Sequence, residues 1–393
     1  MLVMRIRSGN RLHIAFSRRE PGAGRERPMS HDGRMPHKRL AARRRATLKD
    51  VAEAVGVHTS TVSRALNPKT RHRITQEVSE KILKASAELN YQQNAAAYTL
   101  RTRRTRIIGV VIPDITNPVF PPIIRGIEDA LAAQGYMAIV ANTDSALPRG
   151  ASVIDMLCER GVDGLIAASV ERDDPAFRRL AEEGIPIVTV NRRMDDPSIA
   201  SIVNDDDRGM RAVLDHLVAL SHTRIANIAG PQKLSTGKAR LDTFLRHRTA
   251  LDLPADNALI VLAEGFNESE GERCAEVLLA NGVRFTAIVC SNDRLAVGAI
   301  AVLRRHGYAI PSDISVTGFN DMPMVDRMEP PLTTVRVQQY AAGRIAAETL
   351  LARLEQEGTS PAPHHEVLPV ELVVRASTSL ARATTEGKAH LAG

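Results

Sequence analysis

The chain has 393 residues, of which 44% are hydrophobic and 25% are charged, and it carries a net charge of +7. These fractions are typical of a soluble globular protein of two or three domains, and the absence of a long apolar run or an apolar leader predicts a cytoplasmic protein with no membrane segment. The charge is uneven, because residues 1–46 hold 13 Lys/Arg against 3 Asp/Glu, residues 47–106 hold 11 against 5, and residues 107–393 hold 28 against 37, so a polyanion is expected to bind at the N-terminal end.

Residues 1–46 form a basic N-terminal extension with many Gly, Pro and Arg residues and no sustained hydrophobic periodicity. Disorder is the default expectation for such a composition. Two interpretations stay open. The arm adds non-specific affinity for phosphates, or the native protein begins at Met29 or Met35.

The stretch from Thr47 to Asn67 (TLKDVAEAVGVHTSTVSRALN) predicts two short helices joined by a tight turn. Apolar residues recur at helical spacing from Leu48, and Gly56 ends the first helix in the left-handed conformation. The second helix opens at Thr59 or His58 and turns small hydroxyls and one arginine outward, which suits close approach to a DNA duplex. We therefore predict a helix-turn-helix with its second helix in the major groove, against the alternative of an ordinary polar helical hairpin.

A third helix is predicted from Thr75 to Leu89, with Val78, Ile82, Leu83 and Leu89 facing inward. It would complete a small domain at residues 47–91, near the lower size limit for independent stability.

Residues 92–106 are predicted to form a hinge helix and linker. Asn94 is placed to cap a short helix from Ala95 to Arg101, which would be marginal alone in water. Four arginines lie at its end and beyond it. The segment is either a linker with a solvated basic face or a helix that folds only when it pairs with a second copy on DNA.

From Ile107 the pattern changes to short apolar strands that alternate with amphipathic helices. The predicted strands are Ile107–Ile112, Met137–Ala141, Gly164–Ala167, Ile187–Val190, Ile225–Ala229, Ala287–Cys290 and Ile314–Thr317. The predicted helices lie near residues 121–134, 149–160, 174–183, 206–220, 237–248, 270–281, 294–306 and 339–356. This alternation predicts an α/β core with parallel sheets covered on both faces.

The length of this core, about residues 107–378, favours two lobes with a cleft between them. The first lobe is expected at about 107–203 plus 336–356, and the second at about 204–335 plus 357–378. A polar tail of residues 379–393 would follow. Ligands are expected at the carboxyl ends of the strands, in the loops Pro113–Asn117, Asn191–Arg193 and Gly318–Asp321.

An enzyme is the main rival class for this pattern. GPQKLSTGK follows a predicted strand and opens a helix, but its glycines are too far apart for a phosphate-binding loop and its lysine precedes an alanine. Asp205–Asp207 is better explained as charge at a helix N-terminus. The three cysteines, Cys158, Cys274 and Cys290, are odd in number and widely spaced, so neither a cofactor nor a metal site is expected. A solute receptor and a constitutive architectural DNA binder are further rivals.

The motifs, taken together, resemble the lactose/galactose repressor (LacI/GalR) family of bacterial transcription regulators over roughly Thr47 to Ser377. The matching stretches are TLKDVAEAVGV…STVSRALN, NAAAYTLRT, IIGVVIPDITNPVF, GP…STGKARLDTF, SNDRLAVGAI, SVTGFND and PPLTTV. The resemblance implies a helix-turn-helix headpiece with a hinge helix, a two-lobed core like that of a periplasmic binding protein, and a homodimer. It also implies a repressor of a near-palindromic operator on double-stranded DNA.

The resemblance also implies roles for single residues in DNA binding. Thr59, Ser60 and Arg64 would read bases, and Leu100 would wedge into the minor groove at the operator centre. Phosphate and positioning contacts are implied for His58, Thr61, Ser63 and Asn67, with Asn94 as the hinge asparagine. A simple core leucine is the alternative for Leu100.

An effector, expected to be a sugar or sugar derivative, would bind between the lobes. The implied contacts are Asn117, Phe120, Thr236, Arg240, Phe266, Asn292 and Asn320. Phe120 would stack on the effector, while Thr236 and Arg240 would hydrogen-bond it; the alternative for Arg240 is an ordinary surface ion pair. A cytoplasmic solute-binding protein and a purine-responsive co-repressed regulator of the same architecture are the alternative functions.

Three positions depart from the family pattern. Asn320 stands where the family often has Asp, which removes a strongly polarised contact. Gln93 replaces a common proline before the hinge asparagine, and Tyr98 stands where the family often has Arg.

Overall fold

The computed structural model describes residues 46–66, 70–91, 99, 104–144, 147–356 and 362–382. Contacts between residues divide the chain into two compact units, residues 1–93 and residues 94–393, and each unit is described by itself. The predictions for Asn67, Asn94 and Leu100 lie outside the described residues.

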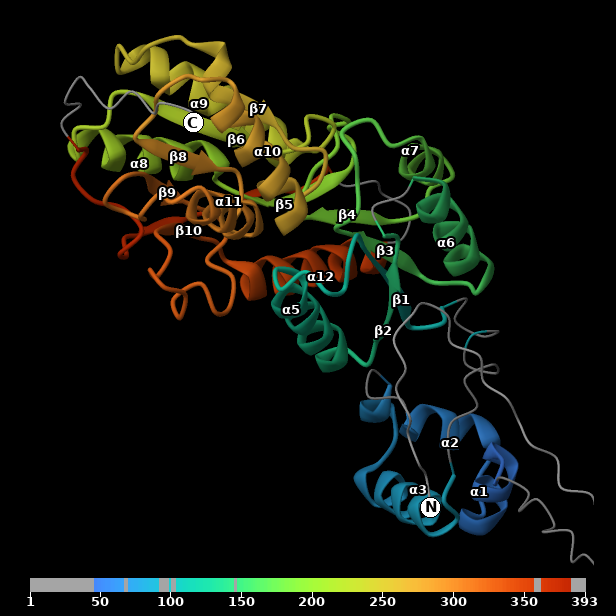
Figure 1. The fold of residues 1–393 in the computed structure, drawn as a ribbon. Coiled ribbons are helices and arrows are strands. Elements are labelled where there is room, and N and C mark those ends of the chain that lie inside the picture. Colours follow the sequence, from blue (N-terminus) through green and yellow to red (C-terminus); the bar gives the residue numbers. More distant parts are fainter. Residues whose placement is uncertain are drawn as a thin grey trace, which may run out of the picture. The chain divides into compact units, whose positions relative to one another are not determined.

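The first unit contains the predicted helix pair (Figure 1). Its elements are α1 (Leu48–Val55), α2 (Thr59–Leu66), a 3-10 turn (Arg71–Arg73) and α3 (Gln76–Glu88). Thr47 and Asp50 cap α1 reciprocally, because each side chain accepts a hydrogen bond from the other residue's backbone N–H. Gly56 ends the helix at a φ of 72°, a conformation that costs glycine nothing. The structure therefore confirms the two predicted helices and the turn between them.

The core of this unit is small and consists of Val51, Ala52, Val62, Ala65 and Ile82, all at most 4% exposed. The inward face predicted for α3 is only partly correct, because Leu83 and Leu89 are 38% and 40% exposed. Leu83 lies one position round the helix from Ile82, and Leu89 follows the last helical residue. Three short helices leave little interior to fill.

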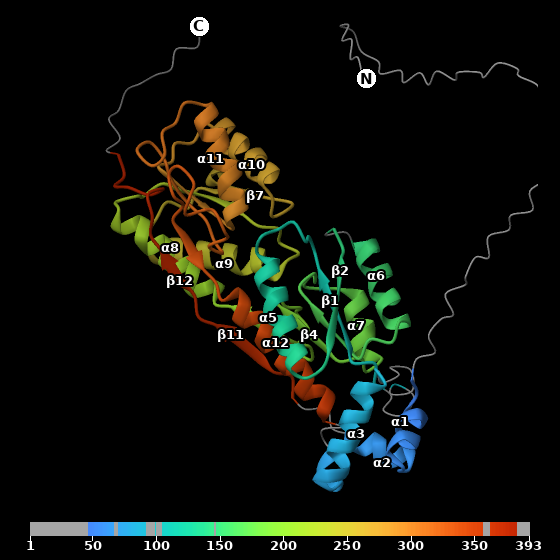
Figure 2. The ribbon, with the colours of Figure 1, turned by 90° about the horizontal axis from the view of Figure 1, so that it is seen from below.

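The first lobe of the second unit is built on a six-stranded parallel sheet (Figure 2). In spatial order its strands are β11 (His365–Leu368), β5 (Ala200–Asn204), β4 (Ile187–Val190), β3 (Gly164–Ala167), β1 (Ile107–Ile112) and β2 (Met137–Asn142). One face packs on α5 (Phe120–Ala133) and α12 (Gln339–Glu355), and the other on α6 (Leu147–Glu159) and α7 (Pro175–Glu182). Covered on both faces, β3 and β4 are buried along their whole length.

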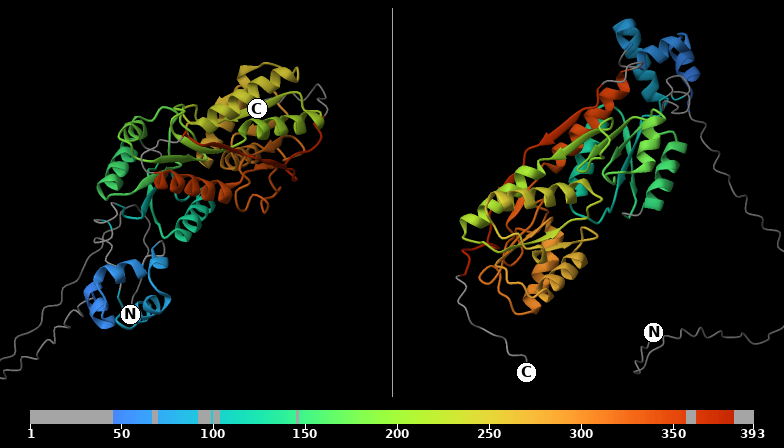
Figure 3. Two further views of the ribbon diagram at one scale, coloured as in Figure 1. Left: turned by 180° about the vertical axis from the view of Figure 1, so that it is seen from behind. Right: turned by 90° about the horizontal axis from the view of Figure 1, so that it is seen from above.

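The second lobe repeats this plan on a four-stranded parallel sheet (Figure 3). Its strands are β7 (Ile260–Leu262), β6 (Ile225–Ala229), β8 (Ala287–Cys290) and β9 (Ser315–Thr317). A 3-10 turn (Asn257–Leu259) precedes β7. One face packs on α10 (Glu268–Ala280) and α11 (Asp293–Arg305), the other on α8 (Asp206–Ala219) and α9 (Ser235–Ala250). A short antiparallel pair, β10 (Thr334–Arg336) with β12 (Glu371–Val373), completes the lobe.

All seven predicted strands are present, and the eight predicted core helices are confirmed to within a few residues. The sequence analysis missed five strands, which are β5, β7, β10, β11 and β12. The structure also corrects the lobe boundary. Residues 365–368, expected in the second lobe, pair in parallel with β5 and form the edge of the first-lobe sheet. Their sequence, HEVL, begins with two polar residues and gives no apolar run, which is why the strand was missed.

The core also extends beyond both of its predicted ends along the chain. Thr105 and Arg106, predicted as linker, donate backbone hydrogen bonds of 2.8 Å to the Asp163 carboxylate. At the other end, the Ser379 carbonyl lies 3.0 Å from His222 Nε2, and the Ala381 N–H donates to Leu220 O. The ordered core therefore begins by Thr105 and continues past residue 378.

The chain crosses between the lobes three times, after β5, after β10 and after β11. Hydrogen bonds join these crossings side by side. The Asp205 N–H donates to Leu368 O at 2.9 Å, and the Gln338 N–H donates to the Asn204 side chain at 3.4 Å. Three adjacent connectors of this kind let the lobes move as bodies about a common hinge. Within the described residues, no helix is long and apolar enough to span a membrane.

Candidate functional site

The outer side of α2 carries the predicted DNA contacts. Val62 and Ala65 point into the core at 0% exposure, which turns the remaining side chains of the helix outward. His58, Ser60 and Arg64 are exposed, and Thr59, Thr61 and Ser63 are half-buried. Six of the seven residues predicted between His58 and Asn67 therefore lie on or just before one short helix.

His58 has a structural role that the sequence analysis did not foresee. Its Nδ1 accepts from the Ser60 N–H at 3.2 Å and lies 2.9 Å from the Ser60 hydroxyl. The ring thus caps the start of α2, where backbone N–H groups lack helical partners. Because Nδ1 accepts, the neutral ring carries its hydrogen on Nε2, which can donate to a phosphate oxygen.

The far end of α2 is held by the segment that follows it. The Thr70 hydroxyl donates to Arg64 O at 3.0 Å, and Arg71 Nε donates to Ala65 O at 2.9 Å. Thr70 and Arg71 therefore each satisfy one C-terminal carbonyl of the helix. This positions Arg64, the one arginine of α2, on a helix fixed at both ends.

In the second unit, the predicted effector contacts come together in one small cavity between the lobes. Its lining includes all seven predicted residues, which are Asn117, Phe120, Thr236, Arg240, Phe266, Asn292 and Asn320. They come from the ends of β1, β7, β8 and β9 and from α9, so the topology gathers loops that are far apart in sequence. The cavity measures about 20 Å³ and is also lined by Val119, Asn191 and Arg192.

Arg240 is the most tightly bound side chain of this cavity, at 2% exposure. Its Nε donates to Asp206 at 2.8 Å, its Nη1 donates to Ser291 O at 2.6 Å, and its guanidinium lies 3.7 Å from the centre of the Phe319 ring. Burial raises the pKa of Asp206, and the Arg240 charge opposes that rise. The ion pair weighed as an alternative for Arg240 therefore exists, but it is buried rather than on the surface.

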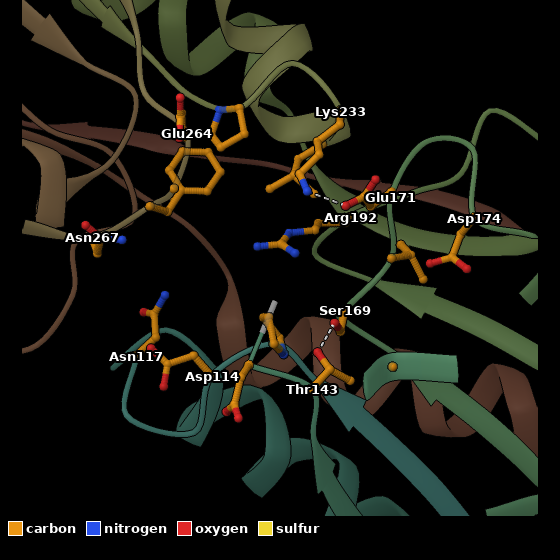
Figure 4. A pocket seen from close by; sticks show the side chains of 18 of the residues that line it. Asp114, Asn117, Thr143, Ser169, Glu171, Asp174, Arg192, Lys233, Glu264 and Asn267 are labelled. Carbon is orange, nitrogen blue, oxygen red and sulfur yellow. Dashed lines mark hydrogen bonds and ion pairs between the residues drawn. The ribbon is translucent and has the colours of Figure 1, made fainter. Parts of the chain in front are cut away.

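Arg192 is a cleft residue that sequence reasoning missed. It is 7% exposed, and its Nε has no hydrogen-bond partner among the described residues. Burial lowers the pKa of this guanidinium to about 10. Figure 4 shows the side chain reaching into the middle of the space between the lobes. Its position in an Asn-Arg-Arg loop gave no periodic signal, although the loop itself was predicted to face the cleft.

A second, larger cavity adjoins the small one and shares Asn117, Arg192 and Phe266 with it. It measures about 330 Å³, and both lobes contribute to its walls (Figure 4). The first lobe supplies the loops after β1, β2 and β3, together with α6, while the second supplies the loops after β6 and β7. Most of the room in the cleft therefore lies beside the predicted residues rather than among them.

Two ion pairs join the lobes at the rim of the larger cavity. Lys233 Nζ of the second lobe lies 2.6 Å from Glu171 of the first. Arg294 lies 2.7 Å from Glu268 in its own lobe and 3.3 Å from Asp114 across the cleft. Burial acts to raise the pKa of Asp114, but hydrogen bonds from Thr116 and Arg294 bring it below its ordinary value. Both pairs would have to break for the cleft to open.

The amide side chains of the cleft are held so that part of each stays available. Asn292 Oδ1 accepts from the Leu295 N–H at 2.9 Å, and Asn117 Oδ1 accepts from the Val119 N–H at 3.2 Å. Each retains an NH₂ group, which can donate to a ligand oxygen. Asn191 and Asn320 take positive φ values of 65° and 117°, where asparagine is tolerated better than most residues.

Comparison with known proteins assigns each of the two units to a protein family. Residues 47–94 match the family of bacterial regulatory proteins of the lacI type, and residues 214–378 match the periplasmic binding protein-like domain. The chain is also 35% identical over 343 residues to the HTH-type transcriptional regulator MalR of Streptomyces coelicolor, covering 85% of this chain and 97% of that one. The chain belongs to the LacI family.

Solved structures of this family agree with the fold. The Lac repressor dimer bound to operator and the anti-inducer ONPF matches with a TM-score of 0.73 at 27% identity, over 85% of this chain and 99% of that one. The complex of the transcriptional regulator CelR with cellobiose matches with a TM-score of 0.65 at 29% identity, over 85% and 100%. This LacI-family member is a DNA-binding transcription regulator with the predicted headpiece and two-lobed core. Its relatives are regulators rather than enzymes.

Proposed function

We propose that this LacI-family protein is a repressor whose operator affinity is controlled by a sugar bound between the two lobes of its core. The observation that carries the proposal is the meeting of all seven implied effector contacts at one cavity. The relative CelR forms a complex with cellobiose, which favours a sugar as the class of effector. Amide donors and buried arginines in the cleft suit a ligand with many hydroxyl groups.

On the DNA side, Thr59, Ser60 and Arg64 are proposed to read bases, while His58, Thr61, Ser63 and Asn67 position the helix on phosphates. The hinge segment is proposed to fold when two copies meet on the operator, with Asn94 at its start and Leu100 as the minor-groove wedge. A dimer would place two recognition helices in successive major grooves, so the operator should be a near-palindrome.

The link between the two sites is proposed to be the arrangement of the lobes. A sugar that favours one arrangement changes the free energy of the DNA-bound dimer, and the same coupling free energy changes the affinity for sugar when DNA is bound. The rim ion pairs Lys233–Glu171 and Arg294–Asp114 favour the closed arrangement seen here.

The proposal is tested by electrophoretic shift assays with a palindromic operator and a scrambled duplex of the same composition, with and without sugars. We expect tight binding to the palindrome alone and a change in affinity of at least about fivefold when a cleft ligand is added. Equal retention of the two duplexes at moderate salt, whatever sugar is present, would refute the proposal.

Arg64→Ala is expected to weaken operator binding by about 1–3 kcal/mol and to relax base preference, because a bidentate contact to a base edge is lost. Shift assays on the operator and on single-base variants measure this change. Lys84→Ala, an exposed cation on α3, is the control and should affect all duplexes alike. If Arg64→Ala also weakens all duplexes by the same factor, Arg64 contacts phosphate instead.

We also propose that the protein is a dimer and that the edge strand β2 forms part of the dimer interface. This strand pairs with β1 on one side, and Met137 and Val140 are 59% and 38% exposed. The free edge of such a strand presents unpaired backbone N–H and C=O groups, with which a second copy can pair. The double variant Met137→Glu/Val140→Glu is expected to run as a monomer in gel filtration with light scattering. Val367→Glu, on the opposite edge strand β11, is the control and should stay dimeric.

A further inference from the structure

We propose that the effector is a neutral disaccharide, rather than a single sugar, a nucleobase or a sugar phosphate. This inference rests on the proposed effector role of the cleft and adds the size and charge of the ligand. It starts from the two connected compartments of the cleft, which differ widely in volume.

The inner compartment is too small for a sugar ring. Its volume of about 20 Å³ is close to the space of about 10–15 Å³ that a single water needs. Phe120, Arg240 and Asn292 in its wall are only 1–3% exposed, and Arg240 is held by its ion pair with Asp206. In this closed arrangement, the compartment receives at most one substituent of the ligand, such as a hydroxyl group, so a sugar ring cannot stack on Phe120 here as the resemblance implies.

The outer compartment is too large for one ring. In the measure used for the inner compartment, where one water needs about 10–15 Å³, 330 Å³ has room for roughly 20–30 waters. A hexose has about a dozen non-hydrogen atoms and a disaccharide about twice as many, and binding sites bury most but not all of a ligand. A single hexose would leave close to half of the compartment to water.

One aromatic side chain offers an apolar surface on the wall that both compartments share. A Cβ on Gly230 would meet the Phe266 ring at 2.4 Å, so the ring packs closely on this glycine. Ile154 of α6 and Phe177 of α7 also border the outer compartment, but each is 1% exposed and presents almost no surface to a ligand. A sugar ring has an apolar C–H face and a polar rim, so Phe266 can stack on one ring of the ligand.

The charges of the outer compartment favour a neutral ligand. Its lining carboxylates are Asp114, Asp144, Glu171, Asp174 and Glu264. Lys233 pairs with Glu171, Arg294 with Asp114, and Asp144 with Arg149 from outside the lining, which leaves the one cation Arg192 against the two carboxylates Asp174 and Glu264. Carboxylates accept hydrogen bonds from sugar hydroxyls, whereas a phosphate would meet this excess of negative charge.

Thermal shift and calorimetry on the full chain test the proposal with a fixed panel. The panel holds six disaccharides (maltose, trehalose, sucrose, cellobiose, lactose and melibiose), four monosaccharides (glucose, galactose, fructose and ribose), glucose 6-phosphate and hypoxanthine. We expect the largest rise in melting temperature with a disaccharide, bound at least tenfold more tightly than its component monosaccharides. A monosaccharide, the phosphate or hypoxanthine as the tightest ligand, or no shift with any of the six disaccharides, overturns the proposal.

A variant that fills the α6 wall tests where the second ring lies. Ala151→Phe is expected to weaken binding of the best disaccharide at least tenfold while leaving the affinity for its component monosaccharide within twofold. Gly150→Leu is a second filling variant, since a Cβ there would meet only Thr143 atoms at 3.8 and 3.9 Å. The control, Met156→Phe, lies on the same helix at a 49% exposed position outside the cavity lining and should not change affinity.

Equal losses for disaccharide and monosaccharide in the filling variants would place both in one subsite and contradict the proposal. The melting temperature without sugar shows whether each variant is folded. The operator shift assay separates this inference from the proposed function. If the protein does not bind the operator specifically, the proposed function is refuted. If it binds the operator and a monosaccharide changes that affinity, only the disaccharide inference is refuted.

Discussion

Replacing Arg240 by alanine is expected to lower the free energy of unfolding of the core by about 3–5 kcal/mol, because it leaves the Asp206 carboxylate, whose side chain is only 12% exposed, without its partner. The guanidinium is 2% exposed, and its removal also empties the space over the Phe319 ring. The same change should abolish the effector response, since Arg240 lines the inner compartment. Chemical denaturation without sugar, followed by circular dichroism, measures the loss of stability.

Further variants separate the buried ion pair from general effects of losing an arginine on α9. Arg246→Ala removes a cation from the same helix, where the side chain is 65% exposed and pairs with Asp207, so a loss within about 1 kcal/mol is expected. The double variant Asp206→Ala/Arg240→Ala removes the stranded charge and should be more stable than Arg240→Ala alone. The single variant Asp206→Ala completes the cycle. If the loss in the double variant equalled the sum of the losses in Asp206→Ala and Arg240→Ala, the pair would not be coupled.

Replacing Arg192 by methionine is expected to act in opposite directions on stability and on binding. Without effector, the variant should be more stable by about 1–3 kcal/mol, because a buried cation with an unbonded Nε is replaced by an apolar side chain of similar length. Its affinity for the effector should fall roughly 10–100-fold, since a charge-assisted hydrogen bond is worth about 1.5–3 kcal/mol. Denaturation and calorimetry with the best sugar of the panel measure the two effects.

Arg193→Met is the matched control for this prediction. Arg193 is the next residue in the same loop, and its side chain is exposed while its N–H donates to Ser235 Oγ at 2.9 Å. Neither stability nor affinity should change much in the control. A loss of stability in Arg192→Met would mean that Arg192 is held by the protein itself rather than kept for a ligand.

The parts of this structure that follow from repeating patterns were predictable from the sequence. Long amphipathic helices and apolar strands such as Ile107–Ile112 give signals over many residues, and Gly56 marks the end of a helix by its chemistry. Four of the five missed strands are short or polar. β7, β10 and β12 have three residues each, and β11 begins with the polar pair His365 and Glu366 at a sheet edge. β5, by contrast, has five residues and is almost wholly buried. Their pairing depends on partners far away in the sequence.

The candidate site shows the same division. The seven effector contacts were found because each belongs to a motif that the family shares, and the structure brings them together. Arg192 has no such motif, and its importance comes from its burial and its unbonded Nε, which only packing determines. The size of the outer compartment is likewise set by the distance between two lobes. That distance cannot be predicted from any local pattern in the sequence.

The three crossings between the lobes mean that neither lobe is a continuous piece of the gene. A truncated chain that ends before residue 365 would lack β11, which belongs to the first-lobe sheet, and β12, which pairs with β10 in the second lobe. Both lobes would therefore lose backbone hydrogen bonds at once. The halves are therefore unsuitable for separate expression or for split-reporter fusions. A circular permutation that opens a surface loop within one half, away from the crossings, would keep every connection intact.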